Sequence, residues 1–371
     1  MSFSREYSTW IEIDQAAIEN NVRLLHKMTG VQVMAVVKAN GYGHGSIPVA
    51  KAALRGGAAW CGVARIEEAL ELRQGGIDCP ILVLGYTPKA RFESAVAHEI
   101  SMAAWTVEQA ELASKIAAGV GRIAKLHLKV DTGMSRLGVR PESTLDLANI
   151  LATLPGIKYE GVFTHFARAD EADQSTNEVQ ERCFRDVLDT LASVELIPPW
   201  IHAANSAAAI ARPDAKFNLI RPGIAIYGLH PSSECRLPPG FIPALSWKAV
   251  LSQVKMVTAG TGVSYGHEYS TASSERIGTL PVGYADGFRR VPGNQVLILG
   301  QHMPVIGRVC MDQVMVQLDS APQAQEGDEA ILIGSQGSER ITAEEVAATW
   351  GTANYEVVCG LGARVPRVYL K

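Results

Sequence analysis

The pattern of apolar and polar positions divides the chain into two regions. From residue 11 to about 228, short apolar runs rich in β-branched residues alternate with segments in which apolar residues recur with a helical period. Eight runs are predicted strands, at residues 31–38, 58–64, 80–86, 100–105, 124–131, 159–165, 200–204 and 218–227. Helices are predicted between most of them, for example at residues 15–28 after an Asp14 cap, 66–73 and 180–193. Eight such units over about 220 residues fit a closed (β/α)8 barrel, an α/β fold, more economically than an open parallel sheet.

The pattern changes near residue 230, where the segment "LHPSSECRLPPGFIPAL" carries four prolines. Short runs separated by Gly, Asp and Asn turns follow, and one helix is predicted near residues 342–350. The predicted strands of this region are residues 247–257, 276–284, 294–300, 303–311, 313–318 and 329–334. We therefore predict a barrel domain at residues 1–241 and a mostly-β domain at 242–371, with the first strand-forming residues able to join either one.

Composition and charge narrow the classes of function. With 47% hydrophobic and 19% charged residues, the chain is typical of a soluble globular protein. No apolar run approaches the roughly 18 residues of a membrane span, and the first residues do not resemble a signal peptide, so we expect a cytoplasmic protein with no membrane partner. A net charge of −4 makes nucleic acid an unexpected partner. The six cysteines lie far apart without a CxxC pair, which favours reduced thiols over disulfides or a metal site.

Polar side chains gather at the carboxyl ends of the predicted strands, where barrel enzymes build their sites. Lys38 ends the first run, Lys129 the fifth and His165 the sixth, and Arg221 lies in the eighth. The same ends also carry Asp131, Arg136, His202, Asn205, Ser206 and Gly223. Each alone has an ordinary explanation, such as a hydrogen-bonded structural histidine or a surface arginine. Because they share one end of the barrel, they together indicate an active site.

Lys38 lies in "AVVKANGYGHG", between an apolar run and a predicted glycine-rich loop. A lysine in an apolar barrel mouth has a lowered pKa, and the neutral amine forms Schiff bases. The loop matches neither a GxGxxG nor a P-loop pattern. However, Ser206 and the backbone N–H of Gly223 follow the seventh and eighth strands, where barrels commonly bind phosphate. An imine-forming lysine beside a phosphate site suggests pyridoxal 5'-phosphate.

These motifs resemble those of bacterial alanine racemases. The segment "AVVKANGYGHG" is similar to their cofactor attachment motif, and the similarity continues in order along the chain. The further motifs are "KVDTGMSRLG", "THF", "HAANSAA", "RPGIAIYG", "VSYGHEY", "PVGYADG", "RVCMDQ" and "NYEVVCGLGARVPR". The resemblance implies a fold-type III pyridoxal-phosphate enzyme with a barrel, a β domain and a head-to-tail homodimer with shared active sites. It also implies interconversion of L-alanine and D-alanine, which supplies D-alanine for peptidoglycan.

The resemblance assigns roles to individual residues. Lys38 would hold the cofactor as a Schiff base and act as acid and base on one face of the substrate, and Tyr265 of the other subunit would act on the opposite face. Racemisation needs one such group on each face. Arg221 would donate a hydrogen bond to the pyridine nitrogen, which leaves the ring a weaker electron sink because arginine does not give up its proton. His165 would connect Arg221 with Tyr265.

The remaining assignments complete the expected site. The resemblance implies cofactor contacts, mainly to the phosphate, for Tyr42, Asn205, Ser206, Gly223, Ile224 and Tyr355. Arg136 and the backbone N–H of Met311 from the partner would bind the substrate carboxylate, and Lys129 matches a position that is carbamylated in some relatives. His202, Tyr284 and Asp312 would support these groups.

The choice of substrate depends on two departures from the family pattern and on the residues that would form the walls of the pocket. Arg168 follows "THF", where a small residue is expected, and Ser135 replaces the glycine of many relatives. Both lie on the side of the site where we expect the entrance or the substrate carboxylate. They therefore bear on substrate access and affinity more than on the type of reaction. Tyr265 and Tyr355 should leave room for a methyl group, so we expect alanine first and serine weakly.

Three alternatives stay open beside the alanine racemase. A serine/alanine racemase of broader specificity differs only in the size of its pocket. A barrel-type amino-acid decarboxylase would share the two-domain plan and the lysine, but such enzymes place an acidic residue at the pyridine nitrogen, and Arg221 argues against this. A pyridoxal-phosphate binding protein would need only a barrel, and the second domain with Tyr265 argues against it.

Overall fold

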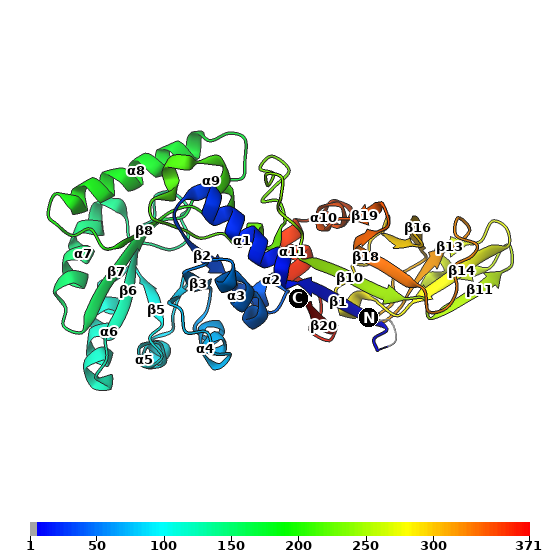
Figure 1. Cartoon of the computed structure of the whole chain (residues 1–371), viewed down its shortest axis with the longest axis horizontal. Coiled ribbons are helices and arrows are strands. Elements are labelled where there is room, and N and C mark those ends of the chain that lie inside the picture. The colour runs from blue at the N-terminus through cyan, green and yellow to red at the C-terminus, as the bar shows by residue number, and fades with distance from the viewer. Residues whose placement is uncertain (1–5) are drawn as a thin grey trace. The chain divides into compact units, whose positions relative to one another are not determined.

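The computed structural model describes residues 6–371, which fold into two compact units. One unit is Ala16–Ile242, and the other contains the described residues up to Gln15 together with Pro243–Lys371. The chain therefore starts in one unit, forms the whole of the other and then returns (Figure 1). No helix in the described part of the chain is long and apolar enough to cross a membrane.

Eight parallel strands form the sheet of the Ala16–Ile242 unit, in the order β8-β7-β6-β5-β4-β3-β2-β9. They are β2 (Gln32–Val36), β3 (Trp60–Val63), β4 (Ile81–Val83), β5 (Ser101–Ala104), β6 (Ala124–Lys129), β7 (Ile157–Phe163), β8 (Trp200–His202) and β9 (Leu219–Ile220). Backbone hydrogen bonds from Asn218 N to Ile201 O and from Arg221 N to Ala204 O connect the two ends of the sheet. All eight predicted strands are present, and the predicted fold class is confirmed.

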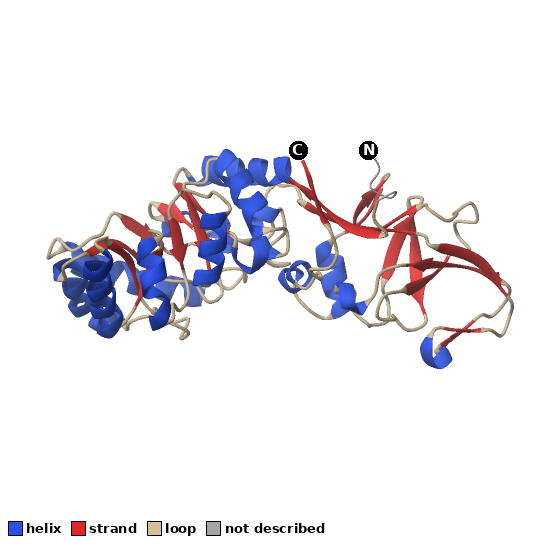
Figure 2. Ribbon diagram, turned by 90° about the horizontal axis from the view of Figure 1, so that it is seen from below, coloured by secondary structure: helices blue, strands red, loops and turns tan. Residues whose placement is uncertain are grey.

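Helices flank the strands of this unit (Figure 2). They are α1 (Gln15–Thr29), α2 (Lys38–Tyr42), α3 (Ser46–Arg55), α4 (Ile66–Gln74), α5 (Phe92–Ala97), α6 (Val107–Val120), α7 (Thr144–Thr153), α8 (Ser175–Ala192) and α9 (Ser206–Ala211). The caps follow from the sequence, since the side chain of Thr106 accepts from Gln109 N at the start of α6 and Asn205 accepts from Ala208 N at the start of α9. The prediction for α8 was wrong by five residues at its start.

Apolar side chains fill much of the barrel interior. Met34, Trp60, Leu82 and Leu219 form a buried cluster on four different strands. The ring of Trp60 lies edge-on to that of Trp200, with centroids 5.7 Å apart. The interior is thus a packed core of the kind expected for this fold, and it also contains the buried His127, whose ring lies edge-on to Trp60.

The second unit is built on a ten-stranded sheet. Its strands follow the order β11-β14-β17-β16-β15-β18-β10-β1-β20, with β19 paired to β18, and β12 and β13 form a separate pair. The bounds are β1 (Thr9–Asp14), β10 (Leu245–Val250), β11 (Gln253–Val257), β12 (Gly262–Val263), β13 (Tyr269–Ser270), β14 (Glu275–Leu280), β15 (Gln295–Ile298), β16 (Gln301–Ile306), β17 (Val314–Gln317), β18 (Glu329–Gln336), β19 (Glu339–Ile341) and β20 (Arg367–Leu370). Asp14, predicted as a helix cap, ends β1.

Two helices and several short turns complete the chain. The predicted helix near residues 342–350 is α10 (Ala343–Trp350), and α11 (Asn354–Cys359) was not predicted. The single strand predicted at residues 247–257 is two strands, β10 and β11. Turns of 3-10 helix are η2 (Lys89–Arg91), η3 (Pro141–Ser143), η4 (Pro213–Lys216), η5 (Ile224–Tyr227), η6 (Tyr265–His267) and η7 (Tyr284–Asp286).

Candidate active site

Lys38 begins a left-handed turn directly after β2. Ala39, Asn40 and Gly41 have φ of 53°, 53° and 60°, and Tyr42 has φ of 51°. Each residue other than glycine loses roughly 1–2 kcal/mol in this conformation. The sequence predicts a glycine-rich loop here. The prediction was incomplete, because the segment is a regular left-handed turn and three of its residues are not glycine. Strain of this kind persists only where the surroundings hold the backbone in place.

Glu68 of α4 supplies part of that support. Its Oε1 accepts a hydrogen bond from Ala39 N at 2.6 Å, and its Oε2 accepts from Ala64 N at 2.8 Å and Arg65 N at 3.0 Å. One carboxylate therefore joins the segments that follow β2 and β3. Sequence reasoning missed Glu68, although a glutamate at the third position of a helix is a known capping signal.

Tyr42, Ser206 and Gly223 converge at the neighbouring strand ends. Ser206 Oγ accepts hydrogen bonds from Gly223 N at 3.0 Å and Ala225 N at 3.2 Å. A Cβ atom at Gly223 would lie 2.3 Å from Tyr42 Oη, so a larger residue there would displace the Tyr42 side chain. Ile224, buried beside them, begins the turn η5. The hydroxyls of Ser206 and Tyr42 form a donor set that suits a phosphate, whereas the N–H groups of Gly223 and Ala225 already donate to Ser206 Oγ.

Arg221 is buried and held by several acceptors. Nη2 donates to Thr164 O at 2.8 Å, Ala203 O at 2.9 Å and His165 Nδ1 at 3.1 Å, and Nη1 donates to His202 Nδ1 at 2.9 Å. Among the described residues, Nε is left without a hydrogen-bond acceptor. Burial lowers the pKa of Arg221 to about 9, so the guanidinium keeps its charge at neutral pH. Burial and this charge lower the pKa of His165 well below its usual range, and the ring stays neutral.

Lys129 lies at the end of β6 within the same positively charged cluster. Its side chain is buried, and Nζ lies 5.4 Å from the ring centroid of Phe163. Burial, followed by the charges of Arg221 and Arg136, lowers the pKa of Lys129 to about 8, against the opposing effect of Asp131. The predicted residues Lys129, Arg136 and Arg221 are therefore close enough to interact electrostatically.

The loop that carries Arg136 is ordered by a carboxylate. Asp131 Oδ1 accepts from Gly133 N at 3.1 Å and from Ser135 N at 3.0 Å. Ser135 has φ of 56°, a conformation that glycine adopts without strain. The serine that departs from the family pattern is thus a strained position beside the exposed Arg136.

Arg168, the other departure, is engaged locally. Its Nε donates to Glu171 Oε2 at 2.7 Å, and both side chains are exposed. Its backbone is tied to α8, where Asn177 Nδ2 donates to Arg168 O at 2.9 Å.

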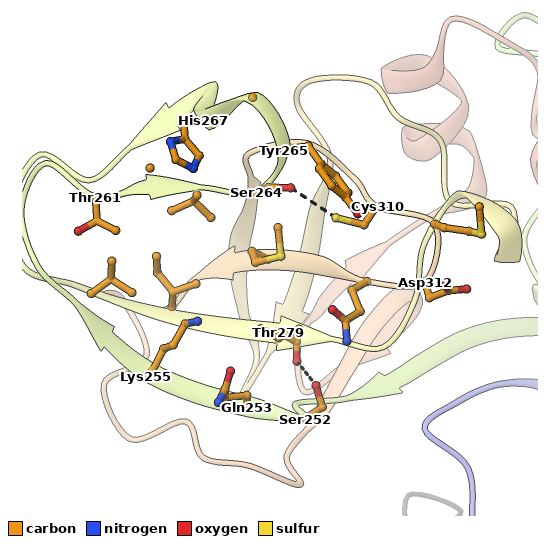
Figure 3. A pocket seen from close by; sticks show the side chains of 18 residues that line it. Ser252, Gln253, Lys255, Thr261, Ser264, Tyr265, His267, Thr279, Cys310 and Asp312 are labelled. Atoms are coloured by element: carbon orange, nitrogen blue, oxygen red, sulfur yellow. Dashed lines mark hydrogen bonds between the residues drawn. The ribbon is translucent and has the colours of Figure 1, made fainter.

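The other predicted residues lie in the second unit, where Tyr265, Met311 and Asp312 line a groove of about 1090 Å³ (Figure 3). Tyr265 begins the turn η6 and is 68% exposed, and Met311 is 52% exposed. Ser264 Oγ donates to Arg308 O at 2.6 Å and lies 3.4 Å from Cys310 Sγ. These contacts attach the segment before Tyr265 to the segment before Met311.

Tyr284, Asp312 and Tyr355 also belong to this unit. Tyr284 N donates to Cys310 O at 3.1 Å, and Asp312 Oδ1 accepts from Arg364 Nη2 at 2.6 Å. Arg364, which sequence reasoning missed, also donates from Nε to the buried Asp286 at 2.6 Å. Tyr355 lies in the first turn of α11, and its contact with the phosphate stays a prediction.

Comparison with known proteins identifies the family. A model of the alanine racemase N-terminal domain matches residues 13–231, and a model of the C-terminal domain matches residues 244–369. The chain belongs to the alanine racemase family. The predictions of this family and of an alanine racemase enzyme are therefore confirmed.

Relatives in the family match along their whole length. Alanine racemases of Symbiobacterium thermophilum and Methanococcus maripaludis are 45% and 44% identical, over 97% of this chain and 97% and 98% of their own. The crystal structure of alanine racemase from Bacillus anthracis with bound L-Ala-P is 40% identical, with a TM-score of 0.92 over 98% of this chain and 95% of that one. Alanine racemase from E. faecalis gives a TM-score of 0.93 at 40% identity, over 98% and 99%.

Proposed function

We propose that this racemase uses pyridoxal 5'-phosphate to interconvert L-alanine and D-alanine, as a homodimer with active sites shared between subunits. The observation that carries the proposal is the buried Arg221, whose other nitrogens are engaged while Nε–H has no acceptor among the described residues. A donor held in this way suits the nitrogen of a pyridine ring. It lies on the barrel that also carries Lys38 and the donor set at Ser206.

The residues present fit the cofactor on chemical grounds. Lys38 would bind its aldehyde carbon, Arg221 its ring nitrogen, and Tyr42, Ser206 and Gly223 its phosphate, with Asn205, Ile224 and Tyr355 as further expected contacts. The clash that a Cβ at Gly223 would have with Tyr42 supports a tightly shaped phosphate site. When bound, pyridoxal phosphate supplies an electron sink conjugated with the α-carbon of an amino acid.

The chain's own residues would bind the substrate and move its α-proton. Arg136 and the backbone N–H of Met311 from the second copy would hold the carboxylate. The amine of Lys38 would remove or return the proton at the α-carbon on one face, and the phenol of Tyr265 from the second copy would do so on the other. Arg221 would leave the ring nitrogen unprotonated, because it donates a hydrogen bond without transferring a proton.

Exposure of the groove in the second unit supports the homodimer. Tyr265 and Met311 line this groove and are exposed, and outside it the unit also exposes Met256 by 59% and Tyr284 by 45%. Exposed apolar surface with a polar rim is typical of interaction sites. A second copy of the chain that covers this face would bring Tyr265 and Met311 to its barrel, and we infer this arrangement from the family.

The substrate and its use follow from the same family. The relative from Bacillus anthracis has bound L-Ala-P, which supports an alanine-like ligand here. We propose alanine as the main substrate, serine as a weak one, and cytoplasmic supply of D-alanine for peptidoglycan. The position of Arg221, where a decarboxylase would carry an acid, argues against release of carbon dioxide.

Two variants test the proposal. Lys38→Ala should lose both the visible absorbance of bound cofactor and racemisation. Tyr265→Phe should keep the absorbance and lower racemisation about 10²–10⁴-fold in both directions, because one of two acid–base groups is missing, whereas exchange of the α-proton should be lost mainly for one enantiomer. Exchange of the α-deuterium of each enantiomer, followed by NMR, separates the two faces.

The matched control is Tyr369→Phe on β20, outside the predicted site, which should behave as the wild type. Exchange of both enantiomers at wild-type rates in Tyr265→Phe would exclude the two-base assignment. Formation of carbon dioxide from L-alanine would favour the decarboxylase.

A further inference from the structure

A row of buried polar side chains continues from Arg221 into the barrel. His202 accepts from Arg221 at Nδ1, and its Nε2 lies 2.9 Å from His127 Nδ1. His127 Nε2 in turn lies 3.4 Å from Glu160 Oε2, close enough for an electrostatic contact but without the geometry of a hydrogen bond. Both histidines are fully buried, and Glu160 is 5% exposed. The row runs over the neighbouring strands β8, β6 and β7, from the carboxyl end of β8 to the middle of β7, and neither His127 nor Glu160 was recognised from the sequence.

Arg221 determines the tautomer of each ring in the row. Because a guanidinium can only donate, His202 Nδ1 must be the acceptor, and its proton lies on Nε2. His202 Nε2–H then donates to His127 Nδ1, so the proton of His127 lies on Nε2, toward Glu160. In the reverse tautomer or the charged form of His202, an N–H on Nδ1 would face the N–H of Arg221 Nη1 at 2.9 Å, and two donors cannot bond to each other. All donors therefore point the same way, and the row ends on a carboxylate.

The pairing of β6 and β7 is adapted to this row. Leu126 pairs with Tyr159 and His127 with Gly161, so the register shifts and Glu160 is the extra residue of a bulge. A Cβ atom at Gly161 would lie 2.2 Å from His127 Nδ1, so the glycine provides the space for the ring. Bulges commonly redirect a side chain near an active site.

The environment keeps the rings neutral and the carboxylate charged. Burial lowers the pKa of His202 and of His127, and the charge of Arg221 acts in the same direction, whereas Glu160 opposes it at His127 without reversing it. Burial alone would raise the pKa of Glu160, but the neighbouring His127, the hydrogen bond from Ser101 and the ion pair with Lys158, whose Nζ lies 3.1 Å from Oε1, outweigh it and hold this pKa at about 2. Ser101 Oγ donates to Glu160 Oε2 at 2.6 Å. Two neutral rings therefore connect a buried cation to a buried anion.

We propose that His127 and Glu160 are positioning residues for Arg221. Acting through His202, they fix the orientation of the guanidinium, so that its Nε–H remains available to the cofactor's ring nitrogen. Glu160 Oε2 is the oxygen that faces His127 Nε2 and favours a proton there. The part of the proposal that concerns the ring nitrogen rests on the proposed function, whereas the tautomers do not.

The tautomers can be measured in cofactor-free protein labelled with ¹⁵N-histidine. The signals of His127 and His202, assigned from their loss in His127→Phe and His202→Phe, should show neutral rings with the proton on Nε2 at pH 7. A proton on Nδ1 of either ring, or a charged ring, would overturn the proposal. This result does not depend on racemisation, so it separates a failure here from a failure of the proposed function.

The effect on the cofactor is tested in His127→Phe, which retains a ring of similar size, loaded with pyridoxal phosphate labelled with ¹⁵N in its ring. We expect a shifted pyridine ¹⁵N signal, and a kcat lowered about tenfold with KM for alanine changed less than about twofold. Glu160→Leu should do the same, whereas Glu160→Gln, whose amide oxygen can still accept, should retain kcat and the ¹⁵N signal. This contrast is the signature of a positioning role.

His98→Phe, an exposed histidine that follows α5, is the matched control and should change neither quantity. Wild-type kcat and ¹⁵N signal in a folded His127→Phe protein would overturn the proposal, as would equal losses in Glu160→Gln and Glu160→Leu. If Glu160→Leu does not fold, the comparison of His127→Phe with Glu160→Gln decides.

Discussion

Lys129 is the residue at which burial and charge act most clearly in the same direction. Its amine is buried near Arg221 and Arg136, and Asp131 is the one group that raises its pKa among the main electrostatic contributors. A pKa of about 8 leaves part of the amine neutral at neutral pH, which is the form that reacts with carbon dioxide. The carbamylation expected from the family would replace a disfavoured cation with an anion near Arg136.

Replacement of this cation should stabilise the protein in a pH-dependent way. Because the pKa of Lys129 is about 8 in the folded protein and 10.5 ordinarily, the unfolded chain binds more protons between these values. The unfavourable contribution is therefore complete below pH 8 and disappears as pH rises toward 10.5. Lys129→Met should unfold about 5 °C above the wild type at pH 7 without cofactor, and the gap should narrow above pH 8.

Thermal unfolding followed by circular dichroism at several pH values measures this difference. Lys115→Met, which alters an exposed lysine on α6, should show no gap at any pH. Bicarbonate should raise the unfolding temperature of the wild type but not of Lys129→Met, because carbamylation removes the same charge. A gap between Lys129→Met and wild type that is independent of pH would contradict the assigned cause.

The left-handed turn of α2 shows how one element depends on another. The sequence indicates positive φ at Gly41, Gly43 and Gly45, but it does not reveal that Ala39 and Asn40 share this conformation. Their strain is offset by hydrogen bonds from the turn to residues outside it, including the one from Ala39 N to Glu68. The orientation of Lys38 thus depends on the start of α4, a different β-α unit.

Glu68→Gln should weaken this support. A glutamine has one accepting oxygen, so it can serve either Ala39 N or the N-terminus of α4, whereas the carboxylate serves both. We expect covalent attachment of pyridoxal phosphate to Lys38, followed by absorbance and borohydride trapping, to slow about tenfold. Glu67→Gln, whose carboxylate is paired with the exposed Arg91, is the control and should attach the cofactor at the wild-type rate. Equal rates in the two variants would show that Glu68 does not hold the turn.

The strands were easier to predict than their ends or the polar parts of helices. Eight buried parallel strands appear as apolar runs, but the run at residues 218–227 is extended only over β9, because Arg221 and the residues after it turn away to form the site. The helix α8 begins before residue 180 because its first turns bury the polar Asn177. A buried asparagine that bonds to Arg168 O leaves no apolar signal.

At the scale of the whole molecule, the site residues were predictable where motifs carry them and unpredictable where packing creates them. Lys38, Arg221 and Tyr265 stand in motifs that resemble the family, and so does His202. Glu160 has no such signal, since its role depends on a register shift between two strands. In the same way, β1 near the start of the chain lies between β10 and β20, and each of these two strands is separated from β1 by more than half of the chain. Contacts of this kind depend on tertiary packing, which the local pattern of apolar and polar residues does not reveal.

The proposed sharing of active sites predicts recovery of activity when two inactive variants are mixed. In a two-fold symmetric dimer of Lys38→Ala and Tyr265→Phe chains, one site would contain both substitutions and the other neither. Random exchange makes half of the dimers hybrid, so racemisation should return to about a quarter of the wild-type value. Mixing Lys38→Ala with the double variant should restore nothing, because every site then lacks Lys38. If mass-tagged subunits exchange and activity still does not return, each site takes Lys38 and Tyr265 from one chain, and the homodimer, if present, would have to serve another purpose.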